Sequence, residues 1–542
     1  MNVSRRSFFG MSAAAGGALL VGCGGPAPQQ GGGGGALNSE ELAKLLPSYS
    51  PVEFAKPDLP GVNGSKAGYL KFPSTLVEAV KEKPLSGGEV TVMTPTFWPV
   101  PPGLGQNSYY DAVNERLGGT VKFELVAGAD YAQKLAAMMA GKQVPELTVM
   151  PTFTVPPRFS AGVGEVFRDI GGLIAGDKAK DYPMLAGIPT AVWENCVYNG
   201  KLFAVPFPGD LFAEATFYRP ELFESLGVDP RVKSFAELKD LCAKVNDPAG
   251  NRWAVGDIFR TLVRARGDKG DWQRDSSGKV VNHIETPEYA AAIRDMRELF
   301  DAGYVHPDVV AGNFSRLKEL FASGQVLLHQ DGVGAWHETF EQQRPVNPDF
   351  RMSAILPFAS DGGKATYPIS NPVSMLTLFR KDLSDDRVKE LLRLCNFAAA
   401  PFGTSEHFLL RYGIDGKHST RNADGSPQLN ALGAKEITLT YGFISGPAEA
   451  YAHTQFPDFV REAHAWHADA YSKQVKPITF GLRIEEPAEL TKLGKQFEDR
   501  TNDILRGRAS AKDADGLAEE WRKAGGDKLR EFYDKVLTDA GR

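Results

Sequence analysis

Cysteine is scarce in this chain of 542 residues, which contains only four. Cys23 belongs to the leader. The other three, Cys196, Cys242 and Cys395, are odd in number and widely spaced, which excludes a disulfide framework and a metal-ligand cluster. Cys242 and Cys395 fall on apolar helical faces, where cysteine serves as a small core residue. The formal net charge of −6 is mild and argues against nucleic acid as a partner.

Apolar runs of membrane-spanning length are also missing. The run Met11–Val21 is too short to cross a bilayer, and no later run approaches that length, so we expect the chain beyond the leader to be soluble. An apolar content of 42% and a charged content of 24% are those of an ordinary globular protein. Roughly 500 residues follow the leader, enough for two or more lobes with separate cores.

Catalytic motifs are missing as well. The sequence has no nucleophile elbow, no zinc-protease His-Glu-x-x-His and no phosphate-binding loop. Ser276 and Lys279 have the spacing of a Ser-Lys nucleophile, but Ser-Ser-Gly-Lys is typical of a turn. His464, His467 and Asp469 share a helical face, for which a metal site and a solvated surface are both open and the solvated surface is favoured. We therefore predict no catalysis, no cofactor and no metal.

Export signals occupy the start of the chain. Arg5-Arg6 precede Phe8-Phe9 as in a twin-arginine signal, and Leu20–Cys23 resembles the lipobox of bacterial lipoproteins. The alternative is a cleaved secretory peptide with an incidental cysteine, but arginine pair, short apolar run, lipobox and Gly-rich stretch follow in lipoprotein order. We therefore expect a signal peptide over 1–22, a lipid on Cys23 that anchors the protein to the cell membrane, and an extracytoplasmic location reached by the twin-arginine route.

The segment 23–85 is predicted to hold a disordered tether, Gly31–Gly35 included, and then an extended arm, because six prolines from 47 to 84 break any helix. From 86 onward the pattern changes to strand, helix, strand, helix, strand, which is typical of a parallel sheet wrapped by helices. These elements are expected over 89–93, 108–118, 121–126, 131–140 and 146–150.

The middle of the chain repeats this alternation. Ser234, Thr286 and Ser384 are predicted helix caps. A Gly/Pro-rich crossing, 358–372, separates strand-like stretches, and the chain ends in helices around Trp466 and Trp521. The predicted strands of this part lie at 326–329, 354–356 and 373–379.

Five motifs in a fixed order carry a family resemblance. They are Asn199–Pro206 (NGKLFAVP), Tyr218–Phe223 (YRPELF) with Leu226–Val228, Phe321–Val326 (FASGQV), Ile355–Phe358 (ILPF) and Leu505–Gly507 before the Trp521 helix. Together, over about 86–540, they resemble the sugar-binding, family 1 type of extracellular solute-binding proteins of bacterial ABC importers, in the large lipoprotein branch of oligosaccharide and aldouronate binders. One departure is polar: His329-Gln330-Asp331 stands where the family is often apolar, which leaves the chemistry of that strand open.

The resemblance implies an α/β, type II-like periplasmic-binding-protein fold of two lobes, each a mostly parallel sheet flanked by helices, with hinge crossings between them. Lobe 1 would take 86–205 and about 370–440, lobe 2 would take 206–365, and 441–542 would form C-terminal helices shared by both. The implied function is capture of a saccharide, by size an oligosaccharide, between the lobes of a monomer. The ligand would then pass to membrane permease subunits of an ABC importer.

Two alternatives stay open. A binder of acidic, uronate-containing sugars would need Arg158, Arg260 or another arginine in the cleft. A surface-anchored enzyme that acts on polysaccharides, or a structural lipoprotein, would carry the same leader.

Candidate ligand residues follow from their positions after strands. A sugar site needs flat aromatic faces and planar polar groups, and loops after the carboxyl ends of strands supply them in α/β lobes. Core packing is an equal alternative for any single tryptophan, and Trp193, Trp466 and Trp521 are assigned to the core. The predicted ligand-binding residues are Phe97, Trp98, Thr152, Phe153, Asp210, Trp253, Asp257, Trp272, Asp331, Trp336, Tyr367 and Asn371.

Overall fold

The computed structural model describes residues 39–542 apart from 63, 98, 157, 315, 345, 483 and 488. Gly34–Arg542 form one compact unit. The predicted signal peptide, the lipid-bearing Cys23, the Gly-rich tether and the candidate Trp98 therefore lie outside the described residues.

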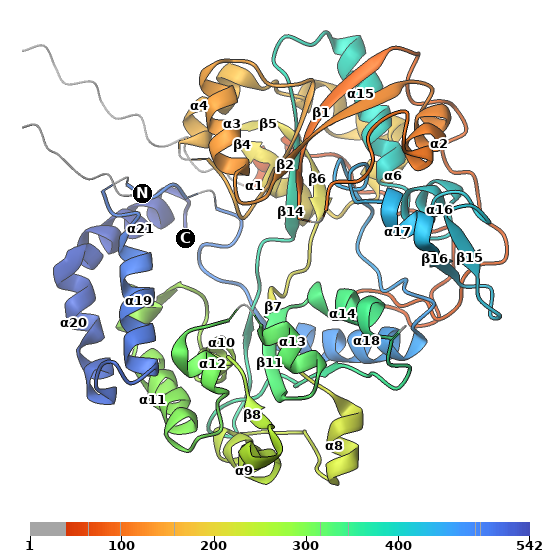
Figure 1. Cartoon of the computed structure of the whole chain (residues 1–542). Coiled ribbons are helices and arrows are strands. Elements are labelled where there is room, and N and C mark those ends of the chain that lie inside the picture. The colour runs from red at the N-terminus through yellow and green to blue at the C-terminus, as the bar shows by residue number, and fades with distance from the viewer. Residues whose placement is uncertain are drawn as a thin grey trace, which may run out of the picture. The chain divides into compact units, whose positions relative to one another are not determined.

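A five-stranded sheet, in the order β2–β1–β3–β14–β6, organises the first core. Its central strands pair in parallel, whereas β14 runs antiparallel to both of its neighbours. Figure 1 shows β14 between strands that come much earlier in the chain. The strands are β1 (Glu89–Thr96), β2 (Thr120–Ala127), β3 (Leu147–Pro151), β6 (Ala204–Pro208) and β14 (Val373–Phe379).

The helices that the sequence predicts over 108–118, over 131–140 and after Ser384 are present in this part. Asn107 caps the first by accepting hydrogen bonds from the backbone N–H groups of Tyr109 and Tyr110, and Gly118 ends it in the left-handed conformation. Ser384 caps another in the predicted way. These helices are α2 (Ser108–Leu117), α3 (Tyr131–Ala140), α4 (Phe159–Val166), α5 (Gly171–Ile174), α6 (Pro183–Ala186), α7 (Thr190–Trp193), α15 (Asp385–Ala398), α16 (Ser405–Tyr412) and α17 (Ala431–Glu436).

A four-stranded sheet, in the order β12–β7–β11–β8, organises the second part of the chain. β11 pairs in parallel with β8 and antiparallel with β7. The strands are β7 (Glu214–Tyr218), β8 (Trp253–Val255), β11 (Val326–Gly332) and β12 (Ser353–Ala354). The helices are α8 (Pro220–Leu226), α9 (Phe235–Val245), α10 (Phe259–Ala265), α11 (Pro287–Asp301), α12 (Pro307–Ala311), α13 (Leu317–Ala322) and α14 (Ala335–Gln343).

Both sheets are mixed, with one strand in each running against the others. The reversed strands are β14 in the first sheet and β7 in the second. Each is the first strand that the chain enters after crossing from the other sheet. Two parallel neighbours must be joined by a crossover connection, usually a helix. No such crossover joins these strands to their neighbours, so they can run antiparallel.

Three crossings join the two sheets. The first, 209–213, and the second, 369–372, lie side by side, because Gly209 N–H donates to Pro372 O (3.0 Å) and Ser370 N–H to Leu211 O (2.6 Å). A side chain at Gly209 would collide with β14, since its β-carbon would lie 2.2 Å from Ser374 Oγ. The third crossing, 445–456, starts where Ser445 Oγ donates to Pro206 O (3.0 Å).

The cores of the two parts are separate hydrophobic clusters. One surrounds the first sheet and includes Val92, Leu147 and Leu376. Two others surround the second sheet, one on Val255 and Val326, the other on Phe217 and Trp336. The predicted core cysteines Cys242 and Cys395 are buried thiols, and Cys196 is buried as well. Burial raises the pKa of the Cys242 thiol to about 12.

The C-terminal helices pack on the second part of the chain. α18 (Pro457–Ser472) contributes Trp466 to the cluster around Phe217. α19 (Leu493–Leu505), α20 (Leu517–Trp521) and α21 (Asp527–Asp539) join the cluster around Val255, and Figure 1 shows α19 beside α11. Trp193, Trp466 and Trp521 are buried, as predicted.

The N-terminal arm differs from its prediction at one end. Ser39–Leu45 form α1 inside the segment expected to be tether and extended arm. Two glutamates in its first turn and Lys44 in its last suit the helix dipole, and its first proline neighbour, Pro47, lies beyond its end. The arm beyond it is extended and is fastened by bridges such as Leu59 to Gly68 and Val77 to Thr404.

Four two-stranded pairs complete the described structure. β9 (Trp272–Arg274) and β10 (Val280–Asn282) form a hairpin, and Ser276 and Lys279 lie in its turn, as predicted. β13 (Tyr367–Pro368) pairs with β17 (Gln474–Val475). The remaining pairs are β4 (Val197–Tyr198) with β5 (Lys201–Leu202), and β15 (Ser419–Arg421) with β16 (Pro427–Leu429).

Candidate functional site

The carboxyl ends of β1, β3 and β6 meet at one edge of the first sheet, which we call the first edge. The first and second crossings leave and enter the sheet there, because Val373 at the start of β14 pairs with Pro208 at the end of β6. Thr152 follows β3 and donates through Oγ1 to Val373 O (2.7 Å). The first edge therefore faces the crossings, the position at which open α/β sheets bind ligands.

Two aromatic rings stand exposed at the first edge. Phe97 is 46% exposed and Phe153 is 67% exposed. Their ring centroids lie 6.0 Å apart. Large apolar side chains are costly to leave in water, so two neighbouring exposed rings on strand-end loops favour contact with a ligand that has an apolar face.

The second sheet presents a polar edge at the same crossings. Glu214 begins β7, one residue after the first crossing, and Gln330 lies near the end of β11. Arg264 Nη2 donates to Glu214 Oε2 (2.7 Å), and Gln330 Nε2 donates to the same oxygen (3.0 Å). The Glu214 network consists of Glu214, Thr216, Thr261, Arg264, Gln330 and Tyr367.

Hydrogen bonds hold this network in one geometry. Thr261 donates to Gln330 Oε1 from its N–H (2.9 Å) and from Oγ1 (3.0 Å). Tyr367 Oη donates to Glu214 O, and burial raises the pKa of the Tyr367 hydroxyl to about 12. The Glu214 side chain is nevertheless 34% exposed, so a fixed carboxylate, amide and guanidinium group reach the edge together. Planar groups of this kind suit pairs of sugar hydroxyls.

The candidate acids beside the network have partners of their own. Asp257 follows β8 and accepts from Phe259 N–H (3.0 Å); burial raises the pKa of its carboxyl, and Glu214 adds to that rise. Asp331 is half-buried and pairs with Lys318 (3.1 Å). Both side chains belong to the second edge, defined here as the carboxyl ends of β8 and β11 and the start of β7.

Asp210 lies in the first crossing and is occupied by protein groups. Lys66 Nζ, from the N-terminal arm, lies 2.5 Å from Asp210 Oδ2, and His467 Nε2 lies 3.1 Å from Oδ1. Burial alone would raise the pKa of this carboxyl, but Lys66 and His467 outweigh burial and hold it well below its usual range. Asp210 therefore fastens the arm and α18 to the crossing.

Three other candidates are covered by protein. Trp336 is 1% exposed and donates from Nε1 to Met352 O (2.8 Å). Trp272 is 4% exposed and stacks on Tyr533 with ring centroids 4.1 Å apart. Trp253 in β8 is half-buried and packs edge-on against His306, with ring centroids 4.6 Å apart.

Asn371, in the second crossing, is exposed and accepts a hydrogen bond from Gly481 N–H (3.3 Å).

The cavity beneath the Glu214 network is small. Its volume is about 20 Å³, and its lining includes Thr216, Arg264 and Tyr367. A space of this size holds one water molecule and not a sugar ring. Any saccharide at this place would therefore lie across the exposed edge, not inside the second core.

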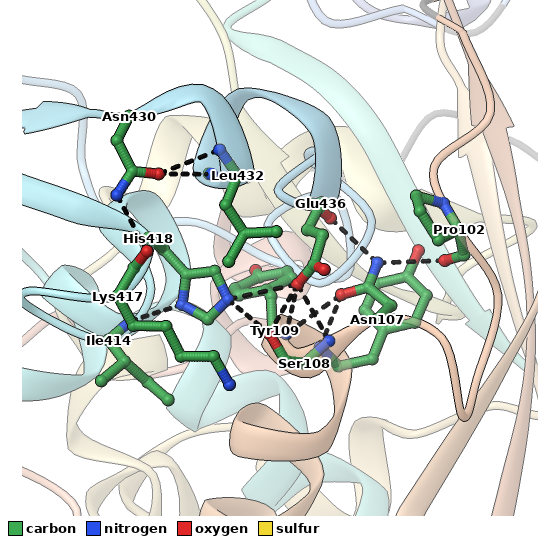
Figure 2. Close-up of polar contacts among 12 residues, drawn as sticks. Pro102, Asn107, Ser108, Tyr109, Ile414, Lys417, His418, Asn430, Leu432 and Glu436 are labelled. Atoms are coloured by element: carbon green, nitrogen blue, oxygen red, sulfur yellow. Dashed lines mark hydrogen bonds and ion pairs between the residues drawn. The ribbon is translucent and has the colours of Figure 1, made fainter.

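A second polar cluster caps α2 (Figure 2). Glu436 accepts hydrogen bonds from the N–H and Oγ of Ser108 (2.9 and 2.7 Å) and lies 3.2 Å from His418 Nε2. Asn107 donates to Pro102 O and to Glu436 O, both at 3.0 Å. These residues satisfy the free N–H groups at the start of the helix, so the cluster is structural.

The His464–His467 pair differs from its prediction. His467 is buried and contacts Asp210 and Tyr451, so the expectation of a solvated face is wrong for this residue. His464 lies 2.9 Å from Pro60 O of the arm. Among the described residues, no group of His, Cys, Asp or Glu side chains is arranged to hold a metal ion.

The Glu214 network was missed from the sequence. Only Tyr367 of its six members was a candidate, because the pairing of β7 with β11 sets the others and that pairing is long-range. The polar Gln330, where the resembled family is often apolar, was the available signal.

No helix within the described part of the chain has the length and hydropathy needed to cross a membrane.

Comparison with known proteins places the chain among transport proteins. A model of the bacterial extracellular solute-binding protein family matches residues 105–377. The polygalacturonan/rhamnogalacturonan-binding protein YtcQ of Bacillus subtilis is 21% identical over 434 residues, which cover 77% of this chain and 85% of that protein. Lipoprotein LipO of the same organism is 21% identical over 487 residues, or 83% and 92% of the two chains.

A solved structure matches the fold over most of the chain. An HMO-binding, ABC-transporter-associated solute-binding protein from Bifidobacterium longum infantis aligns with a TM-score of 0.61 at 12% identity, covering 84% of this chain and 99% of that one. At this identity the likeness carries the fold alone. It confirms the predicted α/β, two-lobe arrangement, built here from two mixed sheets with separate cores.

Proposed function

Because the chain belongs to the bacterial extracellular solute-binding protein family, we propose that it is the saccharide-binding component of an ABC importer. Members of this family are non-enzymatic components of transport and work outside the cytoplasm. The observation that carries the saccharide assignment is the pair of edges at the crossings, one with exposed aromatic rings and one with the Glu214 network.

The names of the relatives support an oligosaccharide as ligand. YtcQ is described as a polygalacturonan/rhamnogalacturonan-binding protein, and the structural match as HMO-binding. Stacking of sugar faces on aromatic rings and hydrogen bonds to fixed planar groups are the contacts that such a ligand needs.

The proposed ligand residues come from both edges. The first edge contributes Phe97, Thr152 and Phe153, with Trp98 next to Phe97 in sequence. The second edge contributes the Glu214 network with Asp257 and Asp331. In our proposal the lobes close on the saccharide by a hinge motion at the crossings, which brings both edges into contact with it.

We further propose that a lipid on Cys23 anchors the protein after export by the twin-arginine route. The supporting pattern is the order Arg5-Arg6, apolar run, Leu20–Cys23 and Gly31–Gly35. A single lipid chain binds membranes only marginally, so anchoring would need the multiple acyl chains that lipoproteins carry. The tether would keep the monomeric receptor close to the permease subunits that accept its ligand.

Saccharide binding to the unit Gly34–Arg542 tests this function. We would measure calorimetric affinity for a panel of neutral and acidic oligosaccharides, then repeat the best ligand with Phe153→Ala. Loss of an exposed stacking ring should weaken binding by about 10-fold, because such contacts contribute about 1–1.5 kcal/mol. Tyr49→Ala removes an exposed ring of the arm and should leave affinity unchanged.

Two results would count against the proposal. If the wild-type protein binds no oligosaccharide of the panel, the saccharide assignment is wrong. Equal loss of affinity in Phe153→Ala and Tyr49→Ala removes the first edge from the site. Trp98→Ala, measured with the same ligand, decides whether that ring belongs to it.

A further inference from the structure

The N-terminal arm contacts both parts of the chain. Beyond α1 its prolines prevent a helix, so its backbone groups pair with other segments. It begins on the first part, where Ser48 N–H donates to Gly176 O (3.0 Å). It returns to that part, where Val77 N–H donates to the carbonyl oxygen of Gly403, just before α16 (3.0 Å). The arm therefore starts and ends on the first part.

Between these two ends the arm lies on the second part. Leu59 and Leu70 pack against one of the two hydrophobic clusters around the second sheet. The carbonyl oxygen of Pro60 lies 2.9 Å from His464 Nε2 of α18. We call residues 59–70 the strap, because the chain passes from one part to the other on either side of them.

The strap runs along the third crossing. Tyr69 N–H donates to Tyr451 O, and Tyr451 N–H donates to Ala67 O, both at 2.8 Å. A β-carbon at Gly68 would lie 3.1 Å from Val460 Cγ1 of α18. The backbone of the strap is therefore packed closely between the third crossing and that helix.

Lys66 joins the strap to two crossings at once. Its Nζ atom lies 2.5 Å from Asp210 Oδ2 in the first crossing and 2.5 Å from Glu449 Oε2 in the third. Its side chain is only 12% exposed. Burial alone would lower the pKa of this ammonium group, but the two carboxylates outweigh burial and raise the pKa well above its usual value. Lys66 therefore stays charged and holds both acids.

A second set of contacts closes a ring through the same crossings. His467 Nε2 of α18 lies 3.1 Å from Asp210 Oδ1, and His467 Nδ1 is hydrogen-bonded to Tyr451 Oη. The Tyr451 ring faces the Lys66 ammonium group, with 5.4 Å from Nζ to the ring centroid. The first crossing is in turn bonded to the second through their backbones, so the contacts of Lys66 link all three crossings.

We propose that the strap regulates the hinge: Lys66 keeps the first and third crossings at a fixed separation, so that the three crossings bend together when the lobes close. A few residues of the connecting segments absorb the motion of a hinge. If the crossings bent independently, the lobes would sample more relative positions, and ligand binding would lose more conformational entropy in ordering them. The strap thus raises ligand affinity from outside the ligand site. The inference rests on the hinge motion of the proposed function and adds its regulation.

Distances between the two parts, measured without ligand, test the strap directly. Spin labels on Gln133→Cys of α3 and Lys244→Cys of α9 report them by pulsed electron paramagnetic resonance. Both positions are exposed, and the native cysteines of the unit Gly34–Arg542 are buried and stay unlabelled. The intact strap should give one narrow distance distribution. Lys66→Met and Glu449→Gln should each broaden it, because each frees the third crossing from the first.

Affinity for the best saccharide of the panel is the second readout. Both variants should weaken binding by about 5-fold or more, the lower end of coupling between distant sites. Glu449→Gln leaves the contact of Lys66 with Asp210 in place, so a loss of affinity in this variant comes from the third crossing. Glu449 is 33% exposed, so this variant should fold even if Lys66→Met does not.

Arg530→Met is the matched control for lost stability. Arg530 is 15% exposed and, like Lys66, joins two acids: Glu285, at 3.1 Å, and Asp527. These residues lie outside the crossings. Arg530→Met should lower the melting temperature but keep the wild-type distance distribution and affinity.

The outcomes separate the strap from the function that it regulates. An unchanged distance distribution in both strap variants overturns the strap and leaves the saccharide function standing. Equal broadening in Arg530→Met also overturns it, because the effect would then follow stability. Broader distances with unchanged affinity overturn its regulatory role. If no saccharide binds, the proposed function fails, and the regulation of affinity fails with it, whereas the ligand-free distances still decide whether Lys66 fixes the crossings.

Discussion

Asp210 illustrates how single ionisable residues are used in this chain. From its sequence position after a strand it was a candidate for ligand contact, and that role stays a prediction. The structure surrounds it with Lys66 from the arm and His467 from α18, both of which are far away in sequence. Long-range ion pairs of this kind cannot be derived from a single sequence, because nothing in local spacing links residues 66, 210 and 467.

The Lys66–Asp210 pair makes a testable contribution to stability. Lys66→Met would leave Asp210 buried without its main counter-ion and should destabilise the protein by about 3 kcal/mol. The double variant Lys66→Met/Asp210→Asn should recover at least about 1 kcal/mol of that loss. Urea unfolding of the four proteins in the cycle measures the coupling. Strictly additive effects would contradict the assignment of Asp210 as a fastening point.

Glu436 gives a second prediction for a single residue, with a defined pH dependence. Burial alone would raise the pKa of its carboxyl, but hydrogen bonds from Ser108, His418 and Tyr109 outweigh burial and lower the pKa. A carboxyl group with a lowered folded-state pKa stabilises the fold above its unfolded pKa, near 4.5, and this stabilisation is lost as the pH falls toward the folded value.

The variant Glu436→Gln tests that account. It should cost about 1–3 kcal/mol at pH 7, where charged hydrogen bonds to the start of α2 are lost. Below about pH 4.5 the difference from wild type should shrink, because the wild-type carboxyl is then being protonated. Melting temperatures of both proteins from pH 3 to 7 measure this. A difference that is independent of pH would contradict the role of the charge.

At the scale of elements, local signals predicted helices well and sheet partners poorly. Caps at Ser234, Thr286 and Ser384 start helices where the sequence indicates, because a cap is a local hydrogen bond. The direction of β14 and β7 did not follow from such signals, since strand pairing depends on contacts between distant segments. For the same reason the sequence did not predict the Glu214 network, whose members meet only when β7 pairs with β11.

The edge formed by β7 and β11 carries its own prediction. Glu214→Gln keeps the size of the side chain but removes the charge that binds Arg264 and Gln330. We expect the affinity for the best saccharide to fall by about 10-fold or more, as for lost hydrogen bonds to a charged group. Calorimetric titration measures this. Glu115→Gln, at an exposed position on α2, is the matched control and should bind like wild type.

At the scale of the whole molecule, the hydrophobic clusters around the two sheets are separate, and the three crossings and the N-terminal arm connect the two parts of the chain. The family resemblance predicted this two-lobe fold, and the structural match confirms it. The ligand is harder to predict from the sequence, because the aromatic candidates differ in burial: Phe153 is exposed, whereas Trp336 is a core residue. Composition and sequence spacing do not distinguish these two residues, and only their positions in the structure do.

One measurement tests the central claim, that this protein captures a saccharide and releases it unchanged. The unit Gly34–Arg542 is titrated with the best oligosaccharide of the panel in a calorimeter, and the saccharide is then recovered and weighed by mass spectrometry. We predict saturable binding of one ligand per chain, a stabilisation of about 2.7 kcal/mol at a ligand concentration 100 times Kd, and recovered saccharide of unchanged mass. Shortened or modified saccharide, or no binding by any member of the panel, would contradict the claim.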